Sequence, residues 1–163
     1  MNEAAILANT MDKSRELSLY YFDQLKDTDL HEQFEVKGVK LNSAIWIIAH
    51  LAVTENWLLL RSTGAEHVKI PWARIFGQGG AVPSKDETPS TETLIKTLNE
   101  VHDRSMSHLN SLTTNDLDDD NTTGFKLFGA KSKRDVINHA IRHEGLHGGH
   151  LGWLCKINGI TTL

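Results

Sequence analysis

The chain has 163 residues and a formal net charge of -4, with 39% hydrophobic and 23% charged residues. Its mean hydropathy is -0.33, and together these values exclude a disordered chain and a membrane-spanning one. The sequence has no basic run that could bind a phosphate backbone, so nucleic acid is not an expected partner. We expect one globular domain over residues 1–163.

The compartment and the redox chemistry follow from two further features. The first turns of the chain carry Glu3 and Asp12 and lack the apolar core of a signal peptide, so we expect a cytoplasmic location. Cys155 is the single cysteine, which excludes an intramolecular disulfide and a zinc site built from thiolates.

Four segments show the apolar spacing of amphipathic helices. They are residues 2–26, 42–61, 90–112 and 133–158. Asn42 or Ser43 is a suitable N-cap for the second helix and Ser90 for the third, and Gly159 ends the fourth. Because the four segments have similar lengths, the sequence predicts an all-α four-helix bundle.

The connections between these helices differ in length. All three prolines lie between Gly64 and Pro89, in the connection between the second and third helices. This connection can run the length of the bundle, which predicts that the second and third helices are parallel. A short strand pattern covers Glu35–Lys40, and the only partner that the sequence suggests for it is Lys126–Phe128.

Four of the nine histidines lie on one face of the fourth helix. Relative to His139, the side chains of His143, His147 and His150 point at about 40°, 80° and 20°, among the apolar residues. A buried imidazole without a partner costs roughly 1 to 3 kcal/mol, so four of them together indicate a metal site. Both His139/His143 and His143/His147 have the spacing by which one helix supplies two ligands to an ion.

A divalent ion in a bundle needs a further ligand from a facing helix. His50 is the candidate, because Trp46 and Trp57 share its inward direction on the second helix. We expect surface or locally satisfied roles for the remaining histidines on loops and on the third helix. These are His31, His67, His102 and His108.

A strip of four glycines occupies the opposite face of the fourth helix. Its members are Gly145, Gly148, Gly149 and Gly152. Each glycine inside a helix costs up to about 1 kcal/mol relative to alanine, so the strip needs a reason. We expect the close approach of another helix or loop, including one from a second subunit; the alternative is a helix that deforms around the site.

The placement of these histidines resembles a known family. The segments IAHL at 48–51 and HEGLHGGH at 143–150 are similar to the motifs of the DinB-like superfamily, and the similarity extends over the whole chain. The resemblance implies a four-helix bundle that holds one divalent metal ion with His50, His143 and His147, usually as a homodimer. Members of the family include metal-dependent thiol S-transferases and related isomerases.

The chain departs from the family motif at two positions. Gly148 stands where the family often has arginine, which puts in doubt a contact with an anionic substrate. His150 stands where the family often has glutamine, so His150 or His139 is open as a fourth imidazole ligand.

Three neutral imidazoles suit zinc or nickel first, with iron and copper as alternatives. An open fourth position predicts an enzyme that activates a thiol or water against a small electrophile, similar to a thiol S-transferase or a hydrolase. Its substrate would be a small molecule, with a low-molecular-weight thiol among the candidates. The alternative is a metal-binding or structural dimeric bundle without turnover.

Other side chains are expected around the metal. Glu144 is expected to be a surface carboxylate, with a role in orienting its neighbour His143 as the alternative. The connection 62–89 is the candidate to cover the site, because long loops in compact domains often serve as lids. Residues expected in the cover or the apolar wall are Trp46, Trp57, Trp72 and Phe76, and Glu55 is a second nearby acid.

Overall fold

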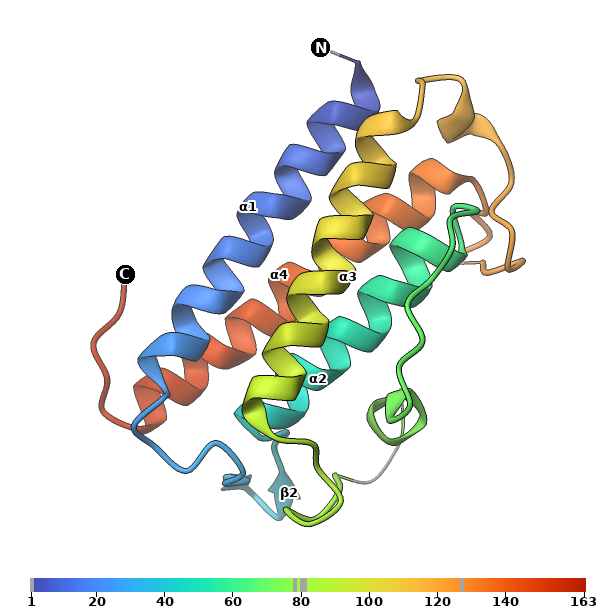
Figure 1. The fold of residues 1–163 in the computed structure, drawn as a ribbon. Coiled ribbons are helices and arrows are strands. Elements are labelled where there is room, and N and C mark those ends of the chain that lie inside the picture. Colours follow the sequence, from blue (N-terminus) through green and yellow to red (C-terminus); the bar gives the residue numbers. More distant parts are fainter. Residues whose placement is uncertain (1, 78, 80–81, 127) are drawn as a thin grey trace.

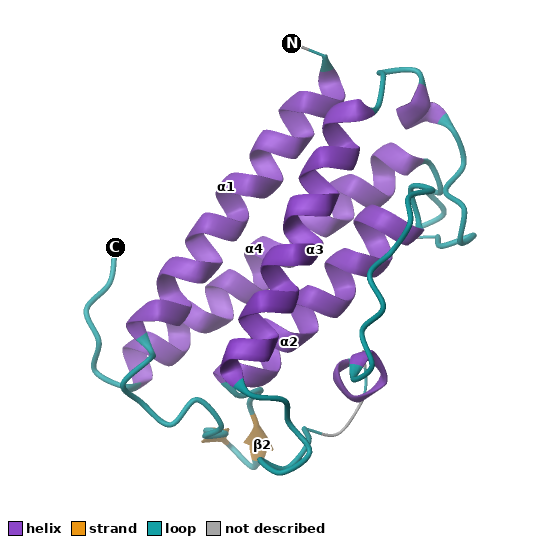
Figure 2. Cartoon of the chain, viewed as in Figure 1, coloured by secondary structure: helices purple, strands orange, loops and turns teal. Residues whose placement is uncertain are grey.

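The computed structural model describes residues 2–77, 79, 82–126 and 128–163. Its four long helices are α1 (Glu3–Gln24), α2 (Ala44–Glu55), α3 (Thr91–Ser111) and α4 (Lys133–Ile157), and they form the expected four-helix bundle (Figure 1). Helix α2 continues into a π-helical segment, Asn56–Arg61, so the helix expected over 42–61 changes its winding midway. Short 3-10 turns at Ala73–Phe76 and Asp116–Asp118 lie in the connections (Figure 2).

A side-chain cap begins each long helix. Asn2, Ser43, Ser90 and Ser132 each accept a hydrogen bond from a backbone N–H in the first turn, and Ser132 forms a full capping box with Asp135. At the other end of α4, Gly159 takes a positive φ of 72°, which is a common way to end a helix. The sequence therefore fixes the helix boundaries locally.

Helices α2 and α3 run in the same direction, as the long connection between them predicts (Figure 1). Hydrogen bonds join Glu55 to His102 and, further along both segments, Thr63 to His108. Helices α1 and α4 are also parallel, since Arg15 pairs with Glu144 and Tyr21 contacts Cys155 further along. The connection 62–89 returns the chain along the bundle, so that α3 starts at the same end as α2.

The strand pattern at 35–40 forms a hairpin with itself. β1 (Glu35–Val36) pairs antiparallel with β2 (Val39–Lys40) (Figure 2). Lys37 and Gly38 form the turn with φ of 51° and 81°, the left-handed pair that a two-residue hairpin of this type requires. The expected pairing with Lys126–Phe128 is wrong, because the tight turn supplies the partner locally. Leu127 of that segment lies outside the described residues.

Two large apolar clusters stacked along the bundle make up most of the core, and a smaller one contains Leu60, Val68 and Val101. Helices α1, α3 and α4 contribute to both large clusters, whereas α2 contributes to the first and its π-helical continuation to the second. The first includes Phe22, Ile48, Leu98 and Leu151, and the second includes Met11, Leu58, Leu109 and Ile137. Polar residues separate the two clusters on every helix. We call these residues the polar layer: Arg15 on α1, Glu55 on α2, His102 on α3 and Glu144 on α4.

Arg15 is the centre of the polar layer. Its Nε donates to Glu144 Oε1 at 2.9 Å, and its Nη2 donates to Glu144 Oε2 at 2.8 Å and to Glu55 Oε2 at 2.7 Å. The side chain of Arg15 is 3% exposed and each carboxylate 1%. Burial opposes the charge of Glu144, but Arg15 outweighs burial and holds the pKa of this carboxyl below its usual value.

The burial of Glu144 corrects the expectation of a surface carboxylate. The physical reason is the close packing of α1 against α4, which the glycine strip permits in part. A Cβ on Gly148 would lie 3.0 Å from Ser18 Oγ, and one on Gly152 would lie 3.4 Å from the Tyr21 ring. Gly145 and Gly149 face open space instead, so only half of the strip serves this contact.

The ion pairs of Arg15 generate a stability prediction. Arg15→Met removes the arginine that pairs with both buried carboxylates and leaves Glu144 without a counter-charge, so we expect the free energy of unfolding to fall by about 3 to 5 kcal/mol. Urea denaturation of the metal-free protein at pH 7 measures this change. Lys13→Met is the control, because Lys13 is 61% exposed on the same helix; equal stability of the two variants would contradict the assignment.

Candidate metal centre

The fold brings three histidines from two helices together. His50 comes from α2, and His143 and His147 come from successive turns of α4. One ligating atom of each lies within 4.8 Å of the others, and we call this group the histidine cluster. His50 is 6% exposed and His147 is 7% exposed. The cluster therefore sits in the wall of the bundle rather than on its surface.

The ring of His50 is held in one orientation by two contacts. Its Nδ1 lies 2.7 Å from the carbonyl oxygen of Phe76, which can only accept, so Nδ1 carries the proton. Its ring also stacks on Trp46, with centroids 4.6 Å apart. Nε2 is thus left with its lone pair and lies 3.2 Å from His143 Nε2. Such a backbone partner is how proteins orient a histidine that ligates a metal.

Two hydrogen bonds from the side chain of Asn56 hold the connection 62–89 against the π-helical segment. The side-chain amide of Asn56 donates to the carbonyl of Val68 and accepts from its N–H, both at 2.9 Å. Further along, the side chain of Phe76 is fully buried and contacts the ring of Trp72 edge-on at 5.6 Å. The connection expected to cover the site therefore lies against His50 and supplies its hydrogen-bond acceptor.

Burial keeps the cluster neutral. Desolvation, together with the neighbouring imidazoles, lowers the pKa of His143 to about 4 and that of His147 to about 3. Desolvation also lowers the pKa of His50, although the hydrogen bond to Phe76 opposes it. Neutral imidazoles are the form that ligates metals. Three converging nitrogen donors without a proton fit one divalent ion of the zinc type.

The other two histidines of this face of α4 lie beside the cluster but outside it. His150 is exposed, with its Nδ1 3.3 Å from His147 Nδ1. The ring of His139 stacks on Phe125 at 5.6 Å and lies 6.0 Å from the ring of His143. Gly148 points toward Ser18 on α1 rather than toward the cluster, so a side chain at that position would be directed into the α1–α4 contact.

A cavity of about 790 Å³ opens onto the histidine cluster. It is bounded by α2, the π-helical segment, the connection 62–89, the α3–α4 connection and α4. Besides the cluster, its lining includes Asn42, Trp46, Val53, Thr54, Trp57, Leu58, Gly77, Gly79, Phe125, His139 and Leu146. Trp46 and Trp57 thus form part of the wall, as the sequence predicts. The volume is that of a small-molecule site.

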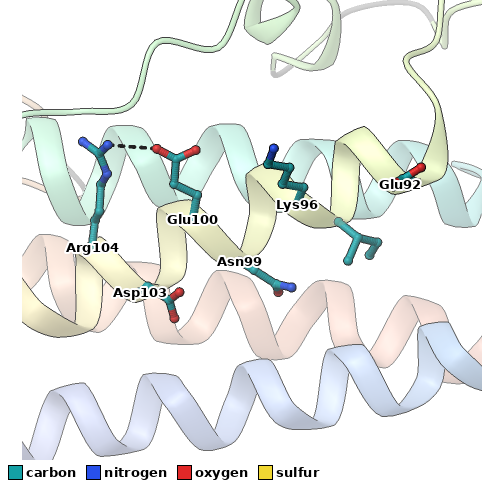
Figure 3. Close-up of a pocket in the computed structure, with 7 residues that line it drawn as sticks. Glu92, Lys96, Asn99, Glu100, Asp103 and Arg104 are labelled. Atoms are coloured by element: carbon teal, nitrogen blue, oxygen red, sulfur yellow. Dashed lines mark hydrogen bonds and ion pairs between the residues drawn. The ribbon is translucent and has the colours of Figure 1, made fainter.

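A second hollow, of about 700 Å³, lies on the outer face of α3 and has different chemistry. Figure 3 shows its side chains along this single helix, among them Lys96 and an ion pair between Glu100 and Arg104 at 2.9 Å. The two paired side chains are 45% and 49% exposed. A solvated row of charges on one helix gives no converging donors, so the cavity at the histidine cluster is the better candidate site.

Two members of the polar layer, His102 and Arg15, were not predicted from the sequence. His102, expected to be locally satisfied at most, bridges Glu55 Oε1 at 2.9 Å and Asp12 Oδ1 at 3.2 Å. Arg15 lies on the buried stripe of α1 between Met11 and Phe22. A lone arginine at that spacing is the signal that would have revealed the buried ion pairs.

His102 carries a raised pKa in this environment. Burial acts to lower the pKa, but the hydrogen bond and the charge of Glu55 raise it further than burial lowers it. Arg15 opposes this effect, and the partly exposed Asp12 adds to it. Protonation of this imidazole places a positive charge beside the second buried carboxylate of the polar layer, Glu55.

A family model described as the DinB superfamily matches residues 10–151. The matched range contains the whole of the histidine cluster and the polar layer. No curated protein matches the chain.

The raised pKa of His102 predicts how stability depends on pH. The folded protein binds the proton more tightly than the unfolded chain, whose histidine pKa is about 6.5. The stabilisation is therefore complete below about pH 6.5 and is lost as pH rises through the higher folded pKa. We expect the stability advantage of the native protein over His102→Gln to be largest below about pH 6.5 and to shrink as the pH rises above that value.

Urea denaturation of both proteins at a series of pH values measures this difference. His67→Gln is the matched control, because it removes an exposed imidazole from a loop. The same pH slope in both comparisons would show that His102 is not the titrating group.

Proposed function

The chain belongs to the DinB superfamily, and from this membership and the histidine cluster we propose that it binds one divalent metal ion through His50, His143 and His147. The supporting observation is the convergence of three neutral imidazoles, one of them oriented by a backbone carbonyl. Zinc or nickel is the proposed ion. Iron and copper are the alternatives, because histidine nitrogens ligate them as well.

We further propose that the protein is an enzyme similar to the thiol S-transferases or hydrolases. The single observation that carries this proposal is the cavity that opens onto the histidine cluster. A divalent ion bound at three histidines lowers the pKa of a water or thiol and so supplies a nucleophile at neutral pH. The small molecule that reacts, including a low-molecular-weight thiol, would occupy the cavity.

The chain's own residues have defined tasks in this proposal. His50, His143 and His147 stay neutral and would bind the metal ion. Trp46 and the connection 62–89 shield the buried side of the cluster from water, and the carbonyl of Phe76 keeps the Nδ1 proton of His50 in place. The hydroxyl of Thr54 lies 3.3 Å from His50 Nε2, where it can donate to or accept from a bound reactant.

A second candidate function is a metal-binding bundle without turnover. The observation that favours it is the position of His150 beside His147 and of His139 beside His143. A fourth imidazole would close the coordination sphere, as in structural zinc sites. Three imidazoles with solvent on the ion support the enzyme, and four imidazoles support this alternative.

We also propose that the protein is a homodimer that pairs through the outer face of α4. Trp153 is 65% exposed and Ile157, one turn further along α4, is 43% exposed. Gly149 lies on this face with no atom near its Cβ position, so a second helix can approach closely there. Such an apolar helix face is typical of a protein contact surface.

The metal proposal predicts the effect of removing each ligand. His50→Ala, His143→Ala and His147→Ala should each weaken metal binding by more than about 100-fold, because a three-histidine site loses a third of its donors. Elemental analysis of untagged protein and titration with zinc measure the loss. His31→Ala is the control and should retain the metal.

Two more variants separate the candidate functions. Retention of metal by His139→Ala and His150→Ala supports an open fourth position, and loss of metal from either supports a closed one. Full metal occupancy in His143→Ala would overturn the site itself.

The dimer proposal predicts a change of mass in solution. Sedimentation equilibrium should give twice 18.2 kDa for the native protein and 18.2 kDa for Trp153→Glu, because a carboxylate in an apolar contact is costly to desolvate. Val39→Glu, at a position that is 65% exposed on the hairpin, should leave the dimer intact. A native protein of 18.2 kDa at high micromolar concentration would exclude the dimer.

A further inference from the structure

The cavity continues past the histidine cluster to an end formed by aromatic rings. On α2 and its π-helical continuation, Thr54 and Trp57 follow His50 by four and seven residues, which is about 6 and 10 Å along a helix. On α4, His139 precedes His143 by one turn, in the same direction along the bundle. Phe125 lies between the two helices at this point. We call Trp57, Phe125 and His139 the aromatic end of the cavity.

The rings of the aromatic end form two walls of a corner. Trp57 and Phe125 are perpendicular, at 88°, with centroids 5.2 Å apart, and Phe125 and His139 stack at 26°. A flat ring that stacks on one of the perpendicular walls meets the other edge-on, and both arrangements are favourable for aromatic pairs. Trp57 and Phe125 are only half-buried, so their free ring surface remains for a ligand to cover.

Charged groups are missing from the described lining of this cavity. No lysine, arginine, aspartate or glutamate contributes to it among the residues that the structure describes. A charged ligand group at the aromatic end would lose its water without gaining a counter-charge, which costs several kcal/mol. An uncharged ligand group does not pay this cost, so the aromatic end selects against charged groups of a ligand.

Polar atoms lie on the side of the aromatic end that faces the histidine cluster. The Thr54 hydroxyl is 3.3 Å from His50 Nε2, which is one of the nitrogens of the histidine cluster. A ligand that fills the cavity therefore meets apolar rings at one end and hydrogen-bonding groups at the other.

We propose that this cavity binds an uncharged aromatic molecule, such as a phenol, an aromatic thiol or an aromatic ester. Its ring lies against Trp57 and Phe125, and its single polar group points to Thr54 and the histidine cluster. The inference rests on the proposed function only in naming this molecule as the reactant; its binding depends on the cavity alone.

Calorimetric titration with matched two-ring probes tests the proposal in the metal-free and in the zinc-loaded protein. We expect 2-naphthol to bind at least about tenfold more tightly than 2-naphthalenesulfonate to the metal-free protein, because the anion finds no counter-charge. Trp57→Ala and Phe125→Leu should each weaken the binding of 2-naphthol about tenfold. Thermal unfolding of each variant verifies that it is folded, and Phe125→Leu provides the milder change.

Two controls define the site. Trp153→Ala removes an exposed indole from the outer face of α4 and should leave the affinity for 2-naphthol unchanged. Thr54→Val keeps the shape of the side chain without its hydroxyl, and should weaken the binding of 2-naphthol more than that of naphthalene.

Three results would overturn the inference: no saturable binding of 2-naphthol, equal affinity for the sulfonate, or an equal loss of affinity in Trp153→Ala and Trp57→Ala. The metal-free titration separates this inference from the proposed function. Selective binding of 2-naphthol to a protein that binds no zinc would refute the metal site and support the cavity. Zinc binding without selectivity for 2-naphthol would support the metal site and refute the proposed ligand of the cavity.

Discussion

Arg15 makes ion pairs with carboxylates on two other helices, between the two large apolar clusters of the bundle. Its three hydrogen bonds, at 2.7 to 2.9 Å, join α1 to Glu55 on α2 and to Glu144 on α4. Apolar clusters above and below could pack in several registers, because methyl groups and rings are not directional. Buried charges are directional and too costly to leave unpaired, so the register that pairs them is the one the bundle adopts.

This register also determines where the histidines meet. Glu144 follows His143 directly on α4, and consecutive helical residues point about 100° apart. Once Glu144 is directed at Arg15 on one side, His143 and His147 must face the adjacent side, toward α2. Glu55 lies five residues after His50 and fixes α2 against the same arginine. The orientation of α2 and α4 that forms the ion pairs therefore also brings the histidines of the cluster together.

The connection between α2 and α3 combines two tasks that a short loop cannot. It returns the chain along the bundle so that α3 runs parallel to α2, and it crosses the histidine cluster on the way. Asn56, at the start of the π-helical segment, is buried and binds both polar backbone groups of Val68. The change from α to π winding directly after Glu55 thus occurs where the side chain of Asn56 holds the long connection against the helix. Trp57, the next residue in the chain, lines the cavity.

Local chemistry was enough to predict the four helices, the Ser90 cap and a cap at Asn42 or Ser43, of which the structure has Ser43. It also predicted the parallel course of α2 and α3 and the histidines that share one face of α4, because each depends on residues near in sequence. The choice among those histidines came from the resemblance to a family, since helical spacing permits both the His139/His143 and the His143/His147 pair. Only the tertiary structure showed that Arg15, Glu55, His102 and Glu144 meet, and that the carbonyl of Phe76 orients His50. These contacts join residues from 26 to 129 positions apart. The burial of a carboxylate at the edge of a helix face depends on how closely the neighbouring helix approaches, and that distance is set by the packing of the whole bundle.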